Sequence, residues 1–490
     1  MTEMAARWRE TTLERYFRFS ENGTTLARDT LAGVTTFIVM SYIIFVNPAI
    51  LGFLGIEGLE ERGLPVAAVA ASTCLVAGTM SILMGLVTNR AFAIAPGLGL
   101  NAVVAFGLVA GAGLGFPEAM GIIVMEGALV TLLVLVGMRE KVMRAIPLEL
   151  KKAIAIGIGL FIAFIGLFNS GLVVRGEGTP VELGRFTTWP ILVTIFGLVI
   201  TVALRAIDFR GDLLLGIILA TIFATIVNWA TDYGAFTTPG VARWPDDPVT
   251  GPDFSLVGAI SFDSFATLGI VATLAWVFSL FLADFFDTMG TLVGVGKQAG
   301  YLNREGELPE IRKPLLVDST AAIAGGFASA SSATTYIESG AGVGAGGRTG
   351  WVAVVAGALF FPFLFFAPII GMVPAQATAP ALIIVGWLMI TALSEAEERA
   401  EPGATRTAER KFAGIDFHDL AIGLSAALTI MVMPFTWSIT NGIGFGFIAY
   451  VVIRIAQGEW RRVNPLMYVA AAGFTLYFLI PLLQDNFDWI

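Results

Sequence analysis

The sequence predicts an all-α polytopic membrane protein with 14 transmembrane segments arranged as a 7+7 inverted repeat. Hydrophobic residues make up 56% of the 490 positions and charged residues only 14%, whereas soluble domains carry about 25% charged residues. Basic residues gather in alternate connections between apolar runs, and two runs seven spans apart are broken in a similar way. Composition predicts the membrane class of the protein, and the pattern of charges and breaks predicts the arrangement of its spans.

Apolar runs close to the length that crosses a bilayer, about 20 residues, recur along the whole chain. The clear runs are 30–52, 66–88, 118–138, 148–169, 188–206, 212–230, 266–294, 350–370, 376–394, 418–433 and 437–456. Residues 92–110 and 331–349 are broken by proline or glycine, and 314–328 is short and rich in small residues. A further apolar run, 464–483, contains Pro481, and whether it crosses stays open.

Positive charges in the even-numbered connections predict a cytoplasmic N-terminus, because cytoplasmic loops carry an excess of Lys and Arg. These residues are Arg139, Lys141, Arg144, Lys151, Lys152, Arg205, Arg210, Lys297, Arg304, Arg312, Lys313, Arg348, Arg399, Arg406, Arg410, Lys411, Arg454, Arg461 and Arg462. The outer connections carry acids such as Glu57, Glu60 and Glu61. We therefore expect a multi-pass protein of the cell (inner or plasma) membrane.

The remaining composition disfavours several other functions. A net charge of -9 argues against nucleic acid as a partner, and a single cysteine, Cys74, excludes an internal disulfide framework. The sequence has no zinc-type histidine cluster, serine nucleophile elbow or nucleotide motif. The glycine run 340–347 lacks the lysine and serine or threonine of a phosphate loop. We expect no enzyme activity, no cofactor and no metal site.

Two broken segments lie third and tenth in the span order. In the first, Pro96 disfavours helix in the residues before it, and Gly97 and Gly99 loosen the backbone after it. Extended backbone is therefore expected over 91–96, and a half helix from near Gly97. The second segment is expected to begin its helix near Ile337. The two segments lie seven spans apart. Because seven is odd, the repeated units that contain them must cross the membrane in opposite directions. Their free amides and positive dipole ends would converge on one ligand.

Acidic residues inside the apolar runs are the candidate functional groups, since a carboxylate at the bilayer centre costs on the order of 3 kcal/mol. Asp284 and Asp287 share one helix face with Thr291, and Glu338 comes after the second break. The only histidine, His418, begins a span beside an inner loop, so proton movement would have to use carboxylates. The roles of Glu126 and Asp318 stay open, with pairing to a neighbouring helix as one interpretation.

From about Phe19 to Gln457 the chain resembles the nucleobase and ascorbate transporter (xanthine/uracil permease) superfamily, and within it the AzgA-like purine permeases. The motifs that carry the resemblance are Leu31-Ala-Gly-Val-Thr-Thr-Phe37, Ile44-Phe-Val-Asn-Pro48, Ala95-Pro-Gly-Leu-Gly-Leu-Asn101, Asp284-Phe-Phe-Asp-Thr-Met-Gly-Thr291, Thr334-Thr-Tyr-Ile-Glu-Ser339, Gly346-Gly-Arg-Thr-Gly350 and Asn441-Gly-Ile-Gly-Phe-Gly446. Ser339-Gly-Ala comes after Glu338 in place of the Asn-x-Gly of the xanthine and urate branch. This difference favours adenine, guanine and hypoxanthine as substrates.

The resemblance implies short β-strands in spans 3 and 10, and a core domain that moves against a gate domain. The implied division is 1–26 cytoplasmic N-terminus, 27–138 core spans 1–4, 139–262 gate spans 5–7, 263–370 core spans 8–11, 371–463 gate spans 12–14 and 464–490 C-terminal apolar segment. In relatives an acid on span 8 grips the base and one on span 10 assists, which by position are Asp287 and Glu338. Relatives often have an ionisable residue where this chain has Thr291.

These observations together predict purine import by proton symport. The expected substrate-binding residues are Asp287, Glu338, Phe92, Thr288, Thr291, Tyr336 and Gly97, and the expected proton-coupling residues are Asp284, Asp287 and Glu338. The partners are then a purine nucleobase, a proton and the lipid bilayer. Sodium coupling, an anion exchanger or a channel of the same architecture are the alternatives. The preferred purine and the choice between monomer and homodimer stay open.

Overall fold

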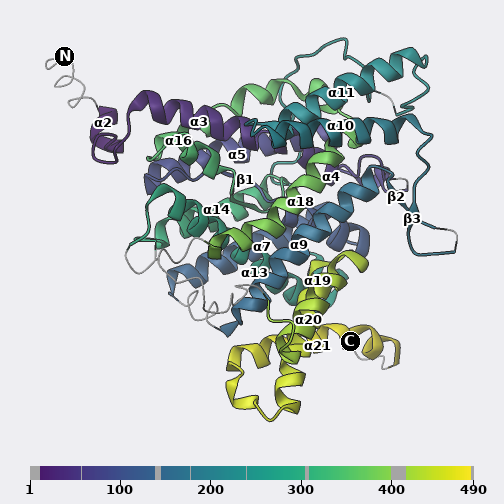
Figure 1. Ribbon diagram of the computed structural model, residues 1–490. Helices are drawn as coiled ribbons and strands as arrows, with labels where there is room; N and C mark the ends of the chain where they lie inside the picture. Colours follow the sequence, from purple (N-terminus) through teal and green to yellow (C-terminus); the bar gives the residue numbers. More distant parts are fainter. Residues whose placement is uncertain are drawn as a thin grey trace, which may run out of the picture.

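The computed structural model describes residues 12–56, 58–137, 145–176, 178–238, 240–303, 308–398 and 415–486. This part of the chain is mostly helical, with long irregular connections (Figure 1). The helices, in chain order, are α2 (Thr12–Phe17), α3 (Leu26–Met40), α4 (Ile43–Leu51), η1 (Glu60–Arg62), α5 (Val66–Thr88), α6 (Leu98–Ala102), η2 (Val103–Gly111), α7 (Phe116–Leu135), α9 (Leu148–Asn169), α10 (Trp189–Ala206), α11 (Asp212–Ala230), α12 (Ser264–Thr267), α13 (Gly269–Ala299), α14 (Arg312–Phe327), α15 (Ser339–Gly344), α16 (Trp351–Ala358), η3 (Phe361–Phe365), α17 (Ala367–Gly371), α18 (Ala375–Glu398), α19 (Leu420–Phe435), α20 (Ile439–Ala456), η4 (Trp460–Arg462) and α21 (Pro465–Asn486).

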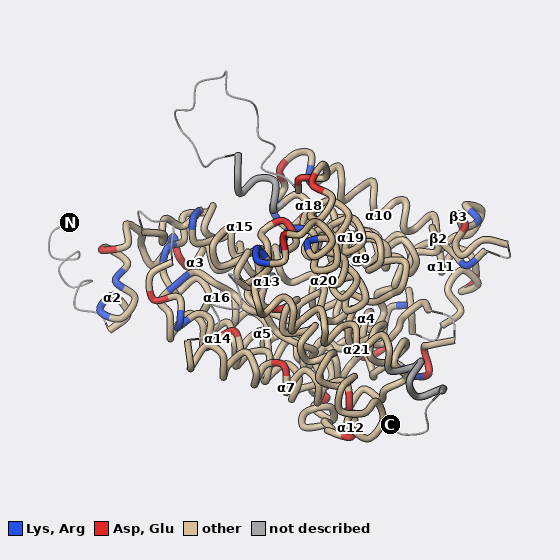
Figure 2. Tube along the Cα trace, turned by 90° about the horizontal axis from the view of Figure 1, so that it is seen from below, with Lys and Arg blue, Asp and Glu red and all other residues tan. Residues whose placement is uncertain are grey.

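Eight helices in the described ranges are long and apolar enough to cross a membrane, and shorter apolar helices add to them. Figure 2 shows a tube that is mostly tan, with Lys, Arg, Asp and Glu gathered at helix ends and in connections. The chain is therefore a multi-pass membrane protein. The count of fourteen crossings and the inverted repeat stay predictions. Of the charges used to predict orientation, Glu57, Arg139, Lys141, Arg144, Arg304, Arg399, Arg406, Arg410 and Lys411 lie outside the described residues.

Glycines bring several of these helices into backbone contact. A Cβ added at Gly357 of α16 would lie 2.6 Å from the carbonyl oxygen of Gly78 on α5. A Cβ at Gly159 of α9 would lie 2.6 Å from the carbonyl oxygen of Gly386 on α18. Lipid tails are as apolar as leucine, so close packing of small residues is a main source of helix association in membranes.

A two-stranded sheet lies among the helices. Strand β1 (Ile94–Pro96) pairs antiparallel with β4 (Ala333–Thr335), with Ala95 opposite Thr334. The pairing extends past both ends, since the Gly97 amide donates to the Ser332 carbonyl at 2.8 Å and the Tyr336 amide donates to the Ala93 carbonyl at 2.9 Å. A second small sheet, β2 (Val173–Val174) with β3 (Glu182–Leu183), lies in the connection between α9 and α10.

Side chains of neighbouring helices satisfy the outer edge of β1. The Ser81 hydroxyl of α5 accepts from the Ile94 amide at 2.8 Å and donates to the Ile94 carbonyl at 2.9 Å. The Ala93 amide donates to the Ser339 hydroxyl at 2.9 Å. Irregular backbone at membrane depth is stable only where protein or a watery cavity satisfies it. These bonds therefore allow both helices to be interrupted within the protein.

Replacing Gly357 by alanine should destabilise the crossing of α5 and α16. The added methyl group meets backbone, which cannot swing aside, and overpacking of this kind costs about 1–3 kcal/mol. Gly473→Ala in α21 is the matched control, because nothing lies within 4 Å of its added Cβ. We expect the melting temperature of the purified protein to fall for Gly357→Ala only. Equal melting temperatures would show that the crossing is not tight.

Candidate functional site

The acids of three predicted spans come together beside the small sheet. Helix α13 carries Asp284 and Asp287 and packs against β4 and α15. Asp287 lies within Coulombic range of Asp318 on α14 and of Glu338, which directly precedes α15. Asp287 and Glu338 are partly exposed, whereas Asp284 and Asp318 are fully buried. The two acids expected to contact a substrate are thus the two that the solvent reaches.

Glu338 is held by a tyrosine from the first predicted span. The Tyr42 hydroxyl donates to Glu338 Oε1 at 2.6 Å, and Tyr42 lies between α3 and α4, where the chain leaves one helix and enters the next. Helix α15 begins at Ser339, close to the start expected near Ile337, and a turn in which the Ser339 amide bonds to the Tyr336 carbonyl leads into it. Sequence reasoning missed Tyr42, whose position in the break between two helices is visible only in three dimensions.

Asp318 joins α13 to β4. Its Oδ1 accepts from the Thr335 amide at 2.8 Å and from the Thr335 hydroxyl at 2.7 Å. Its Oδ2 accepts from the Thr288 hydroxyl at 2.7 Å, and Thr288 also bonds to the Thr334 hydroxyl at 2.7 Å. Hydrogen bonds to a charged group are among the strong ones. Asp318 therefore fixes the helix that carries Asp287 against the strand that leads to Glu338, as the interpretation of pairing with a neighbouring helix requires.

The Gly97 amide is not free, contrary to the sequence prediction, because it donates to the Ser332 carbonyl. The antiparallel register continues one residue past Pro96, and a sequence without its partner strand does not reveal this bond. Asn101, on α6, is fully buried. Within the described residues, neither polar atom of its side-chain amide has a hydrogen-bond partner. Asn101 is thus a group with unused donors and acceptors at the first broken segment.

The two rings expected to cover a ligand are both engaged within the protein. Phe92 is fully buried and meets Tyr301 edge-on, with ring centroids 5.8 Å apart. Tyr336 donates its hydroxyl to the Pro96 carbonyl. Thr291 is buried in α13. In this conformation the Phe92 ring does not reach the solvent, and its role as a binding residue stays a prediction.

Small and polar residues follow Asp287 along one face of α13. Gly290 and Gly294 are exposed, and nothing lies within 4 Å of a Cβ built on either. Gln298, one further turn along, is also exposed, and its Oε1 would lie 2.7 Å from a Cβ at Gly340 of α15. Residues three and four apart share a helix face. The partly exposed acids therefore open onto a stripe of small and polar residues.

Across the residues that the structure describes, no group of three or more His, Cys, Asp and Glu side chains is arranged to hold a metal ion. Mid-membrane acids beside two interrupted helices are typical of secondary transporters, in which such breaks form the binding site. The fold and this cluster thus define the class of the protein as a membrane transporter.

Residues 28–400 match the Permease family, and the chain belongs to this family. The resemblance to the nucleobase and ascorbate transporters is thereby confirmed, and the protein is a permease and not an enzyme.

Named relatives match nearly the whole chain. A putative permease of Methanocaldococcus jannaschii, MJ0326, is 38% identical over 95% of this chain and 98% of its own length. The adenine permease AdeQ of Escherichia coli is 36% identical over 96% of both chains. The guanine/hypoxanthine permease PbuG of Bacillus subtilis is 36% identical over 95% of this chain and 99% of its own.

Solved structures support the fold. The transmembrane domain of a cyanobacterial bicarbonate transporter, BicA, superposes with a TM-score of 0.57 over 86% of this chain and 96% of its own, at 15% sequence identity. At this identity the likeness concerns the fold alone.

Removing the Asp318 carboxylate should loosen the site without touching a ligand. Asp318→Ala leaves the buried Thr335 amide without its acceptor, and an unsatisfied buried donor costs about 1–3 kcal/mol. Asp318→Asn keeps an oxygen for Thr335 and should cost less. We expect thermal unfolding of the purified protein to show a clear drop for alanine and a smaller one for asparagine. Unchanged melting temperatures in both variants would contradict the role of Asp318 in joining α13 to β4.

Proposed function

We propose that this chain is a secondary active transporter that imports purine nucleobases. The observation that carries the proposal is the pair Asp287 and Glu338, partly exposed and within Coulombic range of each other where two broken segments meet. The adenine and guanine/hypoxanthine permeases among the relatives support a purine as the substrate class. Adenine, guanine and hypoxanthine all remain candidates.

Purine chemistry fits this set of side chains. A purine presents ring N–H donors on one edge and carbonyl or ring-nitrogen acceptors on others. Asp287 and Glu338 accept from the N–H edge, and such charge-assisted hydrogen bonds are short and strong. The Asn101 amide supplies both donors and acceptors from α6. Thr288 acts indirectly, since its hydroxyl is bonded to Asp318.

Transport proceeds in this proposal by movement of a core domain against a gate domain. The core comprises 27–138 and 263–370, and the gate comprises 139–262 and 371–463. The open stripe of Gly290, Gly294 and Gln298 provides the route between Asp287 and the cytoplasm. Protonation of one member of the group Asp284, Asp287 and Glu338 accompanies substrate binding. Sodium is the alternative coupling ion, because carboxylate oxygens also suit a hard cation.

An anion exchanger of the same architecture is the second candidate, although the likeness to a bicarbonate transporter concerns the fold alone. The electrostatics of the site disfavour it. Asp318 and Glu338 both lie within Coulombic range of Asp287, and in their ionised form these three acids would repel an anion inside a low-dielectric protein. A neutral heterocycle with N–H donors suits these carboxylates better than bicarbonate does.

Replacing Asp287 by asparagine should abolish most purine uptake. The carboxylate makes a charge-assisted bond worth about 1.5–3 kcal/mol, which corresponds to roughly a 10- to 100-fold loss of affinity. Uptake of radiolabelled adenine, guanine and hypoxanthine into proteoliposomes measures the effect, with Asp232→Asn in the connection after α11 as the matched control. Wild-type uptake by Asp287→Asn for all three purines would exclude Asp287 as the central binding residue.

The coupling ion can be identified with the same proteoliposomes. We expect an inward proton gradient without sodium to drive accumulation, and a protonophore to abolish it, because the site has carboxylates that can carry a proton. Glu338→Gln should weaken purine binding, because Glu338 accepts from the base, and should lose its response to the gradient if Glu338 is the coupling residue. Accumulation driven by a sodium gradient at equal pH would contradict proton symport.

A further inference from the structure

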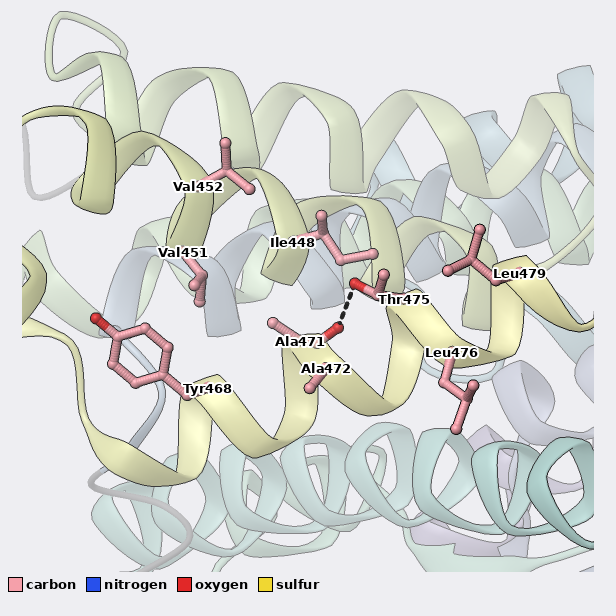
Figure 3. Close-up of a pocket in the computed structure, with 9 residues that line it drawn as sticks. All are labelled: Ile448, Val451, Val452, Tyr468, Ala471, Ala472, Thr475, Leu476 and Leu479. Atoms are coloured by element: carbon pink, nitrogen blue, oxygen red, sulfur yellow. Dashed lines mark hydrogen bonds between the residues drawn. The ribbon is translucent and has the colours of Figure 1, made fainter.

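The C-terminal helix α21 forms a groove that lies outside the candidate functional site. Helix α21 packs against α20 and α13. Between α20 and α21 lies a groove of about 440 Å³, shown in Figure 3. The lining residues are Ile448, Val451 and Val452 of α20 and Tyr468, Ala471, Ala472, Thr475, Leu476 and Leu479 of α21.

The two hydroxyl groups that line the groove both donate their protons within the protein, so neither is a free donor for a polar ligand. Thr475 donates its hydroxyl to the Ala471 carbonyl of the same helix at 2.8 Å, and Tyr468 donates its hydroxyl to the Trp460 carbonyl at 2.8 Å. All other lining side chains are aliphatic. A purine would lose its hydrogen bonds with water here and regain none. The occupant must therefore be a flexible apolar chain.

The length of the groove matches one leaflet of a bilayer. Tyr468 and Leu479 lie at opposite ends of the groove in Figure 3. The α-helix between them rises 1.5 Å per residue, which gives a length of about 16 Å. The hydrocarbon core is about 30 Å thick, so a leaflet supplies roughly half of this. One acyl chain fits such a groove from end to end.

Aromatic and basic residues stand at the Tyr468 end. The turn η4 carries Trp460, which is exposed, and Arg461, whose guanidinium lies 5.0 Å from the Trp460 ring. Arg462 forms an ion pair with Glu459, and Arg454 forms ion pairs with Glu459 and Asp419. Among the described residues, Arg461 takes part in no ion pair. Tryptophan and arginine are typical of the headgroup level of a membrane, and an unpaired guanidinium suits a phosphate.

We propose that the groove between α20 and α21 binds one acyl chain of an anionic phospholipid, with its phosphate at Arg461. The basic turn η4 places this lipid in the cytoplasmic leaflet, where anionic lipids attract basic segments. The site is independent of the purine proposal, because none of its residues touches the acids of the candidate functional site.

Native mass spectrometry of the full-length protein in a non-ionic detergent tests the proposal. Phosphatidylglycerol is added in one series and phosphatidylcholine with the same acyl chains in the other. We expect several-fold more phosphatidylglycerol adducts on the wild type. Arg461→Gln should reduce them to the phosphatidylcholine level, and Ala472→Phe, which fills the groove, should reduce adducts of both lipids.

Two exposed positions away from the groove supply matched controls, Arg210→Gln after α10 and Ala203→Phe on α10, and both should keep wild-type adducts. Wild-type phosphatidylglycerol adducts on Arg461→Gln or on Ala472→Phe would overturn the proposal. So would a dimer of the wild type that Ala472→Phe dissociates while leaving lipid adducts unchanged, since the groove would then be an interface between two copies.

Discussion

The structure depends on satisfying interrupted backbone inside a membrane. Unpaired amides and carbonyls in hydrocarbon each cost several kcal/mol, so a helix can be broken there only if other parts of the protein replace its hydrogen bonds. Strands β1 and β4 bond to each other, and the hydroxyls of Ser81 and Ser339 bond to the backbone around Ile94. The helices can thus be interrupted because residues far away in the sequence supply the missing hydrogen bonds.

The same bonds position the acids. Asp318 is a fully buried acid, and burial of an uncompensated charge is costly. Three donors from Thr288 and Thr335 offset that cost, and in doing so they attach α13 to β4. Asp287 lies one residue before Thr288, and Glu338 lies three residues after Thr335. A buried acid with a structural role therefore sets the spacing of Asp287 and Glu338, the two partly exposed acids for which we propose a binding role.

Composition, the broken segments and the isolated acids were enough to predict the membrane class and the residues that cluster. Those signals are local, since a proline, a glycine or a carboxylate in an apolar run stands out by itself. The errors concern long-range partners. The bond from Gly97 to Ser332 joins segments far apart in the chain, and so does the bond from Tyr42 to Glu338.

A fold shared with a bicarbonate transporter does not determine the substrate, because a common scaffold can present different side chains to different ligands. Helix N-termini that point into a membrane favour negative charge. In this chain two acids already stand there, Glu338 directly before α15 and Asp287 within Coulombic range of it. A second anion would have to displace or neutralise these carboxylates. A neutral ring with N–H donors would bond to these acids without displacing them, which is why we propose a base and not an anion as the ligand.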